Sequence, residues 1–284
     1  MIAGEAFAKI NIGLRVGSQR ADGFHPISGI FQSVSVADRL RLEHARDDTI
    51  ESATGGSVVD GFDNLAFQAA AAVREVAGST QPMRLTLAKT IPIAAGLAGG
   101  SADAAAGLVL AAELFDVGHD VLTELAPQLG SDVPFCLAGG TARVAGRGED
   151  VAGMEPLQGF ALAIVVPPVE ISTPETFKQW DEMGEPEGLR TPSHTLPPVL
   201  RNEGDLLNDL YPAAVRIVPE LDEWRSELER AWARPVMLSG SGPALFGFFV
   251  DHDEAAGAVI DIPIGTRFAE ACDLSSVGWR ITEV

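Results

Sequence analysis

Residues 91–108 read IPIAAGLAGGSADAAAGL. A proline and three glycines lie ahead of Ser101 and an alanine-rich run that has the composition of a helix. Glycines in this position let bare backbone N–H groups approach a ligand, and the positive end of the helix dipole favours a negatively charged one. The stretch therefore predicts a phosphate-binding loop, with Ser101 as the N-cap and Asp103 in the first turn of the helix.

This loop matches neither of the two common phosphate motifs. It lacks the Gly-Lys-Ser/Thr ending of a Walker loop, and its glycines do not have the spacing of a dinucleotide fingerprint. The alternative is a tight loop whose glycines serve only close packing between a strand and a helix. Clustered glycines together with a helix start favour anion binding, so the identity of the phosphate has to come from the rest of the chain.

Length and composition point to a globular protein. The chain has 284 residues, of which 46% are hydrophobic and 21% charged, which is enough for one large domain or two modest ones. A shift in composition predicts an N-terminal domain over 1–155 and a C-terminal domain over 156–284.

No apolar run is long enough to span a bilayer and no signal peptide is visible, so a cytoplasmic protein is expected. Cys136 and Cys272 are too few for a disulfide framework and lack metal-ligand spacing.

The charge balance excludes some partners. The formal net charge is −20, which argues against nucleic acid and against an anionic membrane, because both require a positive surface. Lysine is scarce: Lys9, Lys89 and Lys178 are the only three. An acidic protein that binds phosphate must therefore build a local positive site from few residues.

Hydrophobic periodicity predicts an alternation of strands and helices. In residues 6–16 the side chains of Lys9 and Asn11 share one face, opposite an apolar face. Asp63 and Thr173 are the expected N-caps of two further helices, and residues 181–205 read as a long surface loop. Strands are expected over 6–16, 30–42 with a break at Asp38-Arg39, 83–88, 141–145, 159–166 and on both sides of the turn at 239–243; helices are expected after residues 63, 100, 120 and 173 and over 219–231.

Several single residues have an ordinary structural explanation when each is taken alone. Lys9 and Asn11 fit the solvated edge of a half-buried sheet, and Asp132 fits a helix cap because Pro134 follows it. His25 fits an exposed or a hydrogen-bonded loop histidine, and the SGSGP sequence at 239–243 fits a plain hairpin. No one of these residues identifies a function by itself.

In combination, five segments resemble the GHMP family of small-molecule kinases. The resemblance implies an α/β fold of two domains with an ATP site in the cleft between them. The glycine loop and the GSDVPF and RADGFH sequences are its most specific marks. The segments are AFAKINIGLRV (6–16), RADGFHPISGIFQSV (20–34), IPIAAGLAGGSADAA (91–105), LGSDVPFCLAGGTARVAGRGE (129–149) and MLSGSGPALF (237–246).

The resemblance also implies a set of site residues. Lys9 and Asp132 match the catalytic pair of the family, with Asp132 as general base and Lys9 keeping it ionised. ATP and Mg²⁺ are the implied cofactors, and the motifs do not identify the ligands of the metal. The residues implied in ATP binding are Pro92, Ala94, Ala95, Gly96, Leu97, Ala98, Gly99, Gly100, Ser101 and Asp103.

The implied substrate is a small molecule, a methylerythritol linked to cytidine diphosphate, phosphorylated on its 2-hydroxyl in the non-mevalonate isoprenoid route. Asn11, Phe24, His25 and Phe177 match its binding residues, with an imidazole hydrogen bond and aromatic stacking for the cytosine. Phe24 stands where tyrosine is common, so stacking is retained and a hydroxyl contact is lost. In the ATP loop, alanines 95 and 98 stand where glycines are frequent.

Three alternatives remain open from the sequence. The first is another GHMP kinase, of the homoserine or mevalonate type, against which the RADGFHPI segment argues. The second is a non-catalytic nucleotide-binding protein on this fold, against which the joint presence of Lys9 and Asp132 argues. The third is a globular scaffold without a ligand, which leaves the glycine loop unexplained.

Overall fold

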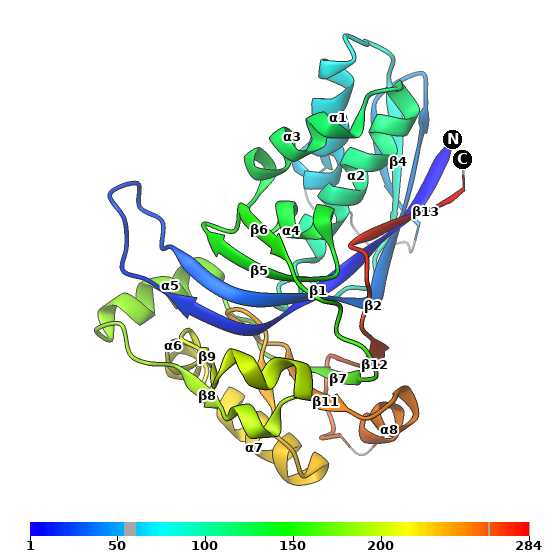
Figure 1. The fold of residues 1–284 in the computed structure, drawn as a ribbon. Coiled ribbons are helices and arrows are strands. Elements are labelled where there is room, and N and C mark those ends of the chain that lie inside the picture. The colour runs from blue at the N-terminus through cyan, green and yellow to red at the C-terminus, as the bar shows by residue number, and fades with distance from the viewer. Residues whose placement is uncertain (54–60, 261, 284) are drawn as a thin grey trace.

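The computed structural model describes residues 1–53, 61–260 and 262–283. Two β-sheets form its framework, and the long pair β1 and β2 runs through the middle of the molecule (Figure 1). Helices α1 to α4 gather on one side of this pair, and the second sheet with α5 to α8 lies on the other. The first and last strands of the chain, β1 and β13, lie side by side, because they pair with each other.

The first sheet contains nine of the described strands. Its order is β3-β4-β2-β1-β9-β8, while β13 pairs with β1, β5 pairs with β2 and β6 pairs with β5. β1 and β2 are antiparallel along almost their whole length. The strands are β1 (Ile2–Val16), β2 (Ile27–His44), β3 (Thr49–Ser52), β4 (Met83–Ala88), β5 (Thr141–Gly146), β6 (Asp150–Gly153), β8 (Leu189–Thr191), β9 (Leu206–Asn208) and β13 (Trp279–Glu283).

Helix α2 is the most deeply buried helix of the layer formed by α1 to α4. All residues from Ala102 to Ala112 are buried, which explains why this helix consists mainly of small side chains. A Cβ at Gly107 would lie 2.6 Å from the carbonyl oxygen of Ala66 in α1, so the two helices pack at close range. The helices of this layer are α1 (Leu65–Val76), α2 (Gly99–Phe115), α3 (Leu122–Leu129) and α4 (Val133–Ala138).

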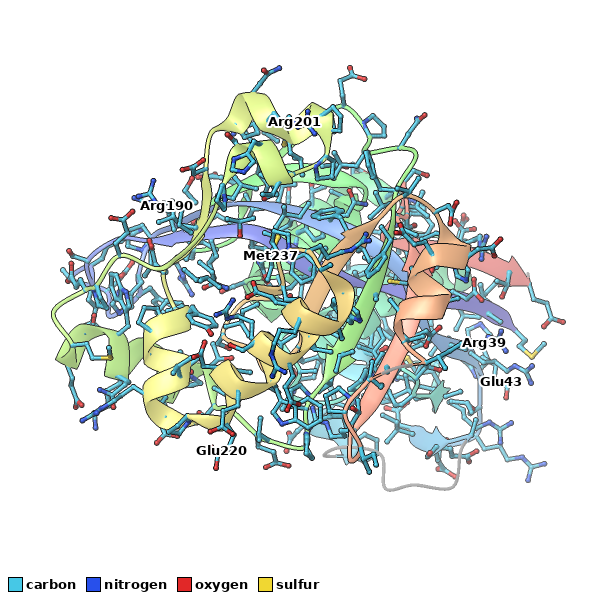
Figure 2. All side chains as sticks on the ribbon, turned by 90° about the horizontal axis from the view of Figure 1, so that it is seen from below. Arg39, Glu43, Arg190, Arg201, Glu220 and Met237 are labelled. Atoms are coloured by element: carbon cyan, nitrogen blue, oxygen red, sulfur yellow. The ribbon has the colours of Figure 1, made fainter. Side chains whose placement is uncertain are left out.

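The second sheet has the order β10-β11-β7-β12. Every residue of β7 is buried, as expected for the apolar run at 159–166. Charged side chains such as Arg190, Arg201 and Glu220 point outward on this side, whereas Met237 lies inside (Figure 2). The elements are β7 (Ala161–Val166), β10 (Met237–Leu238), β11 (Leu245–Phe249), β12 (Phe268–Asp273), α5 (Thr173–Glu182), α6 (Tyr211–Ile217), α7 (Glu220–Trp232) and α8 (His252–Ala258).

The break expected at Asp38-Arg39 is wrong, because β2 is continuous through these residues. Asp38 is fully buried, yet its carboxylate accepts hydrogen bonds from the backbone N–H groups of Thr90 and Ile91. A buried carboxylate that is satisfied in this way does not interrupt a strand. Sequence periodicity cannot reveal such a distant partner.

Other local expectations also need correction. The N-cap of α1 is Asn64 rather than Asp63, and Ser172 rather than Thr173 accepts the capping bond of α5. The segment 181–205 is not a plain loop, because it contains β8 and 3₁₀ turns. The 3₁₀ turns of the described chain are η1 (Gly61–Asp63), η2 (His119–Val121), η3 (Ser193–Thr195) and η4 (Pro198–Glu203).

The division into 1–155 and 156–284 remains a prediction. The second sheet is formed entirely by residues after 155, whereas β8, β9 and β13 cross over to pair within the first sheet. In the described residues, no helix has both the length and the apolar character needed to cross a membrane.

Candidate active site

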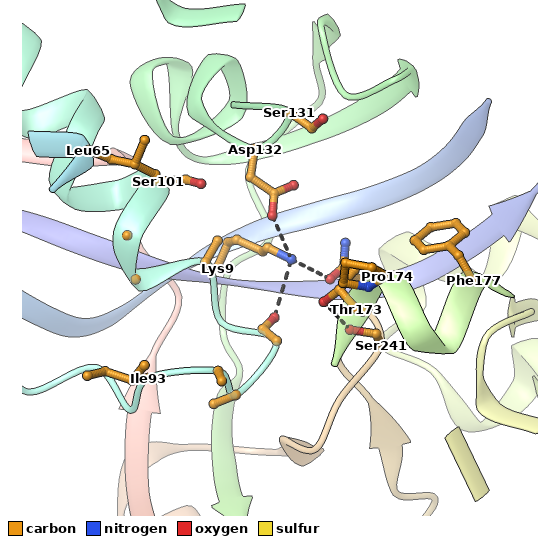
Figure 3. A pocket seen from close by; sticks show the side chains of 18 of the residues that line it. Lys9, Leu65, Ile93, Ser101, Ser131, Asp132, Thr173, Pro174, Phe177 and Ser241 are labelled. Carbon is orange, nitrogen blue, oxygen red and sulfur yellow. Dashed lines mark hydrogen bonds and ion pairs between the residues drawn. The ribbon is translucent and has the colours of Figure 1, made fainter. Parts of the chain in front are cut away.

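A cavity of about 1180 Å³ lies where β1, the glycine loop, α5 and the turn at 239–241 come together (Figure 3). All three lysines, Lys9, Lys89 and Lys178, line it, so the scarce ammonium groups are concentrated here. Of the residues expected in the site, only Leu97 does not line the cavity, because its side chain is buried in the core. Those that do are Lys9, Asn11, Phe24, His25, Pro92, Ala94, Ala95, Gly96, Ala98, Gly99, Gly100, Ser101, Asp103, Asp132 and Phe177.

The backbone of the glycine loop takes an unusual path. Gly96 has φ +80°, and Ala94 and Ala98 are also left-handed, with φ +51° and +55°. Helix α2 begins at Gly99, and its first hydrogen bond runs from the N–H of Ala102 to the carbonyl of Ala98 at 2.9 Å. The N–H groups that precede this bond have no acceptor within the helix, and the residues that carry them line the cavity. They are suited to bind an anion such as phosphate.

Two expectations for the start of α2 are wrong. Ala98 occupies the N-cap position and makes no side-chain cap, so Ser101 lies inside the helix. Asp103 is the fifth residue of the helix, beyond the first turn, and its carboxylate contacts Lys89 Nζ at 2.5 Å. The alanine at position 98 adopts the left-handed conformation that usually requires glycine, which shifts the helix start ahead of the serine.

The loop is held against β1 and the 239–241 turn. The backbone N–H of Lys9 donates to the carbonyl of Leu97 at 3.1 Å. The hydroxyl of Ser239 donates to the carbonyl of Gly96 at 2.8 Å. A Cβ at Gly96 would lie 2.3 Å from the backbone oxygen of Ser239, so this position requires glycine. The SGSGP segment therefore supports the loop rather than serving as a plain hairpin.

Lys9 and Asp132 face each other inside the cavity. Lys9 Nζ lies 3.4 Å from Asp132 Oδ2, donates to Asn11 Oδ1 at 2.7 Å and donates to the carbonyl of Gly96 at 3.3 Å (Figure 3). Lys9 is only 4% exposed, whereas the carboxylate of Asp132 is 30% exposed and remains open to the cavity. One ammonium group thus connects the carboxylate of Asp132 to the glycine loop.

The ordinary explanation is wrong for Lys9 and Asn11, and for Asp132 it holds only for the position of the residue. Lys9 and Asn11 are buried, so they do not form a solvated sheet edge. Asp132 occupies the N-cap position of α4, but its side chain makes no capping hydrogen bond. Its carboxylate pairs with Lys9 instead.

His25 is fixed by protein groups on both sides of its ring. Its Nδ1 lies 3.0 Å from the carbonyl of Gly17, and its Nε2 lies 3.3 Å from Asp181 Oδ2. Phe177 stacks on the imidazole with ring centroids 5.1 Å apart, and Trp180 meets it edge-on at 5.8 Å. Both ring nitrogens are already engaged, so a base bound through this ring would replace one of these partners.

Phe24 offers a different surface. It is 44% exposed, and the guanidinium of Arg147 lies 3.5 Å from the centroid of its ring. An arginine plane on an aromatic face is a favourable cation–π arrangement. Phe24 and Arg147 both line the cavity, on the side of His25.

Comparison with known proteins places the chain in a family. The family described as "GHMP kinases N terminal domain" matches residues 64–140, and "GHMP kinases C terminal" matches residues 199–262. A 4-diphosphocytidyl-2-C-methyl-D-erythritol kinase from Moorella thermoacetica is 39% identical over 88% of this chain and 90% of its own. One from Streptomyces coelicolor is 37% identical over 83% of each chain.

A crystal structure of 4-(cytidine 5'-diphospho)-2C-methyl-D-erythritol kinase superposes with a TM-score of 0.77. It is 33% identical and covers 95% of this chain and 98% of its own. The chain belongs to the 4-diphosphocytidyl-2-C-methyl-D-erythritol kinase family of GHMP kinases. A homoserine kinase from Cytophaga hutchinsonii has a TM-score of 0.71 over 99% of this chain, but at 18% identity it shares only the fold.

Family membership confirms the predicted fold class. The two GHMP matches lie on either side of the proposed boundary at residue 155. The cavity is lined by residues from both sides of that boundary. β1, the glycine loop and the start of α4 supply one wall. α5 and the 239–241 turn supply the other.

The groups that line the cavity suit the phosphates of ATP. The free N–H groups at the start of α2 and the nearby lysines suit a triphosphate. The described residues contain no group of three His, Cys, Asp or Glu side chains that could hold a metal ion.

Sequence reasoning missed several residues that line the cavity. Thr173 was expected only as a helix cap, but its hydroxyl lies 2.7 Å from that of Ser241 and joins α5 to the 239–241 turn. Arg147 lies within a segment that carried the resemblance, and its charge next to a glycine was an available signal. Nothing in the sequence pattern pointed to Asp181.

Proposed function

We propose that this chain transfers the γ-phosphoryl group of ATP to the 2-hydroxyl of 4-diphosphocytidyl-2-C-methyl-D-erythritol. The observation that carries this proposal is the Lys9–Asp132 pair. The ammonium group of Lys9 also donates to the carbonyl of Gly96 in the glycine loop. Relatives that bear the name of this kinase cover nearly the whole chain, which supports the choice of substrate.

In this proposal Asp132 is the general base. Its partly exposed carboxylate would accept the proton of the attacking hydroxyl as the new O–P bond forms and the bond to ADP breaks. Lys9 would stabilise the negative charge that develops on the transferred phosphoryl group. Because phosphoryl transfer needs positioning more than covalent help, two side chains and a rigid loop are sufficient protein machinery.

The loop would hold the phosphates of ATP through the N–H groups at the start of α2. Mg²⁺ would supply further neutralisation of phosphate charge, and phosphates would provide most of its ligands. Hydrogen bonds from Ser239 and from Lys9 of β1 hold the loop carbonyls, so these N–H groups are oriented before ATP binds. Such preorganisation avoids reorganisation at the moment of reaction.

The cytidine would lie at the His25 end of the cavity. A cytosine ring is planar and neutral, so the aromatic faces of Phe24 and Phe177 and the imidazole of His25 are suitable partners. All three side chains line the cavity that also contains Lys9 and Asp132. Asn11, whose amide oxygen accepts from Lys9, would bind the substrate between these two ends.

A substrate panel tests this proposal. Purified protein is supplied with ATP and, separately, with 4-diphosphocytidyl-2-C-methyl-D-erythritol, homoserine and mevalonate, and phosphorylated products are measured. The proposal expects transfer to the cytidine compound at a kcat/KM at least about 1000-fold above the other two, because a site built for a polar base strongly rejects substrates without one. Preferred transfer to homoserine or mevalonate would mean that the proposed substrate is wrong. ATP binding without transfer to any of the three compounds would favour a non-catalytic nucleotide-binding protein.

A further inference from the structure

A second charged cluster lies directly behind the phosphate loop. Lys89 Nζ donates to Asp103 Oδ2 at 2.5 Å and also to Asp38 Oδ2. Asp38 is completely buried, and Asp103 is only 3% exposed. Lys89 and Asp103 line the same cavity as Lys9. The proposed mechanism gives these three side chains no chemical step, although the resemblance implies that Asp103 takes part in ATP binding.

The cluster connects both ends of the loop to the central sheet. Asp38, on β2, accepts hydrogen bonds at its Oδ1 from the N–H groups of Thr90 at 2.5 Å and Ile91 at 2.9 Å, which immediately precede the loop. Asp103 belongs to α2, which immediately follows it. Lys89 bridges the two carboxylates, so a single ammonium group joins the entrance and the exit of the loop.

The charges in this cluster do not balance if both carboxyl groups are ionised. Two carboxylates would share one ammonium group, and Asp103 Oδ1 is a buried oxygen without a hydrogen-bond partner in the structure. Burial raises the pKa of Asp103 to about 8, in spite of the opposing charge of Lys89 and with a further contribution from Asp38. The thiol of Cys136 in α4 also interacts electrostatically with Asp103, and Asp132 and Lys9 interact with the same thiol. A protonated Asp103 makes the cluster neutral.

We propose that Lys89, Asp38 and Asp103 form a latch that positions the phosphate loop, and that the protonated form of Asp103 is the one that accepts ATP. The proposal rests on the proposed function only in taking ATP as the ligand. A deprotonated Asp103 would add a buried negative charge next to the triphosphate site, where charges are weakly screened. Asp103 is a positioning residue here, since it acts through Lys89 and the loop.

The first test needs no ligand. Asp103→Asn keeps the shape of the protonated carboxyl and cannot ionise, so its melting temperature is compared with that of the unmodified protein from pH 5 to pH 9. Because the folded-state pKa of Asp103 is raised well above that of an unperturbed aspartate, the folded protein binds the extra proton between about pH 4 and pH 8. Stability contributed by this proton is therefore lost as the pH rises towards 8. The unmodified protein should lose melting temperature relative to Asp103→Asn over this interval.

The second test measures ATP binding by calorimetry at pH 7 and pH 9. The unmodified protein should bind ATP about tenfold more weakly at pH 9, as expected for one added charge near the phosphates, whereas Asp103→Asn should change less than about twofold. The ionisation of ATP itself affects both proteins equally and cancels in the comparison. Asp48→Asn is the matched control, because Asp48 also pairs with a cation, Arg74, but does not line the cavity.

Two results would overturn the proposal. One is an equal loss of ATP affinity at high pH in the unmodified protein and in Asp103→Asn. The other is a melting difference between these two proteins that does not change with pH. Absence of ATP binding by the unmodified protein at both pH values would instead overturn the proposed function and the nucleotide half of the latch, while the melting comparison would still decide whether Asp103 holds the proton.

Discussion

The ammonium group of Lys9 lies 3.4 Å from Asp132 Oδ2, although the two residues belong to β1 and to the start of α4. The same group donates to the carbonyl of Gly96 at 3.3 Å. A base that must act on a hydroxyl near the γ-phosphate of ATP needs this proximity to the phosphate loop. The arrangement explains why a chain with only three lysines places one of them in a nearly inaccessible position.

Lys9→Met should lower turnover by roughly 100-fold, because it removes the cation that stabilises charge on the transferred phosphoryl group. The KM for ATP should also rise, since Lys9 contacts the loop. The loss in the double variant with Asp132→Asn should be smaller than the product of the two single losses, because the residues act as a unit. Arg84→Met, which removes an exposed cation paired with Glu43, is the control for loss of charge alone. Independent, multiplicative losses in steady-state kinetics would contradict this coupling.

His25→Ala should raise the KM for the cytidine substrate about tenfold, within the 1–3 kcal/mol range for losing a buried hydrogen-bonding group. The KM for ATP should stay within about twofold, since the ring is held at the α5 end of the cavity by Gly17, Asp181 and Phe177. Initial-rate measurements with each substrate varied separately give both values. A weaker KM for ATP with an unchanged KM for the cytidine substrate would move His25 to the nucleotide pocket.

Gly96→Ala should both destabilise the protein and impair ATP use. The left-handed φ of +80° costs an alanine about 1–2 kcal/mol, and the new Cβ would also lie 2.3 Å from the backbone oxygen of Ser239. Gly78→Ala is the matched control, because Gly78 has φ +62° and no atom within 4 Å of an added Cβ. Thermal unfolding should show a clearly larger loss for Gly96→Ala. Equal losses in the two variants would mean that the contact with Ser239 relaxes without cost.

The fold class and most of the cavity lining were predicted from the resemblance to the GHMP kinases, which rests on short local motifs. Glycines ahead of an alanine-rich helix indicate a tight loop, because glycine adopts backbone conformations that other residues avoid. Lys9 and Asn11 are two residues apart, so in any strand their side chains share one face. Their burial could not be predicted, since it depends on the 239–241 turn more than 200 residues away. For the same reason the solvated-edge interpretation of Lys9 failed.

The helix caps and the charged cluster were missed for two different physical reasons. Ser101 has the chemistry of an N-cap, but the left-handed Ala98 starts the helix ahead of it. Asp38 looked like a strand breaker because a lone buried carboxylate is costly, and its partners lie about 50 residues further along the chain. Only the three-dimensional arrangement shows that Lys89 compensates it.

Asp132→Asn gives the most direct test of the proposed mechanism, measured as turnover of 4-diphosphocytidyl-2-C-methyl-D-erythritol with ATP and accompanied by a melting curve. The amide keeps the shape of the side chain and cannot accept the proton of the hydroxyl, so kcat should fall by roughly 100-fold or more while both KM values stay within about threefold. The melting temperature should change little, because the side chain makes no capping bond in α4. Near-unchanged turnover in a folded Asp132→Asn protein would contradict the role of Asp132 as general base.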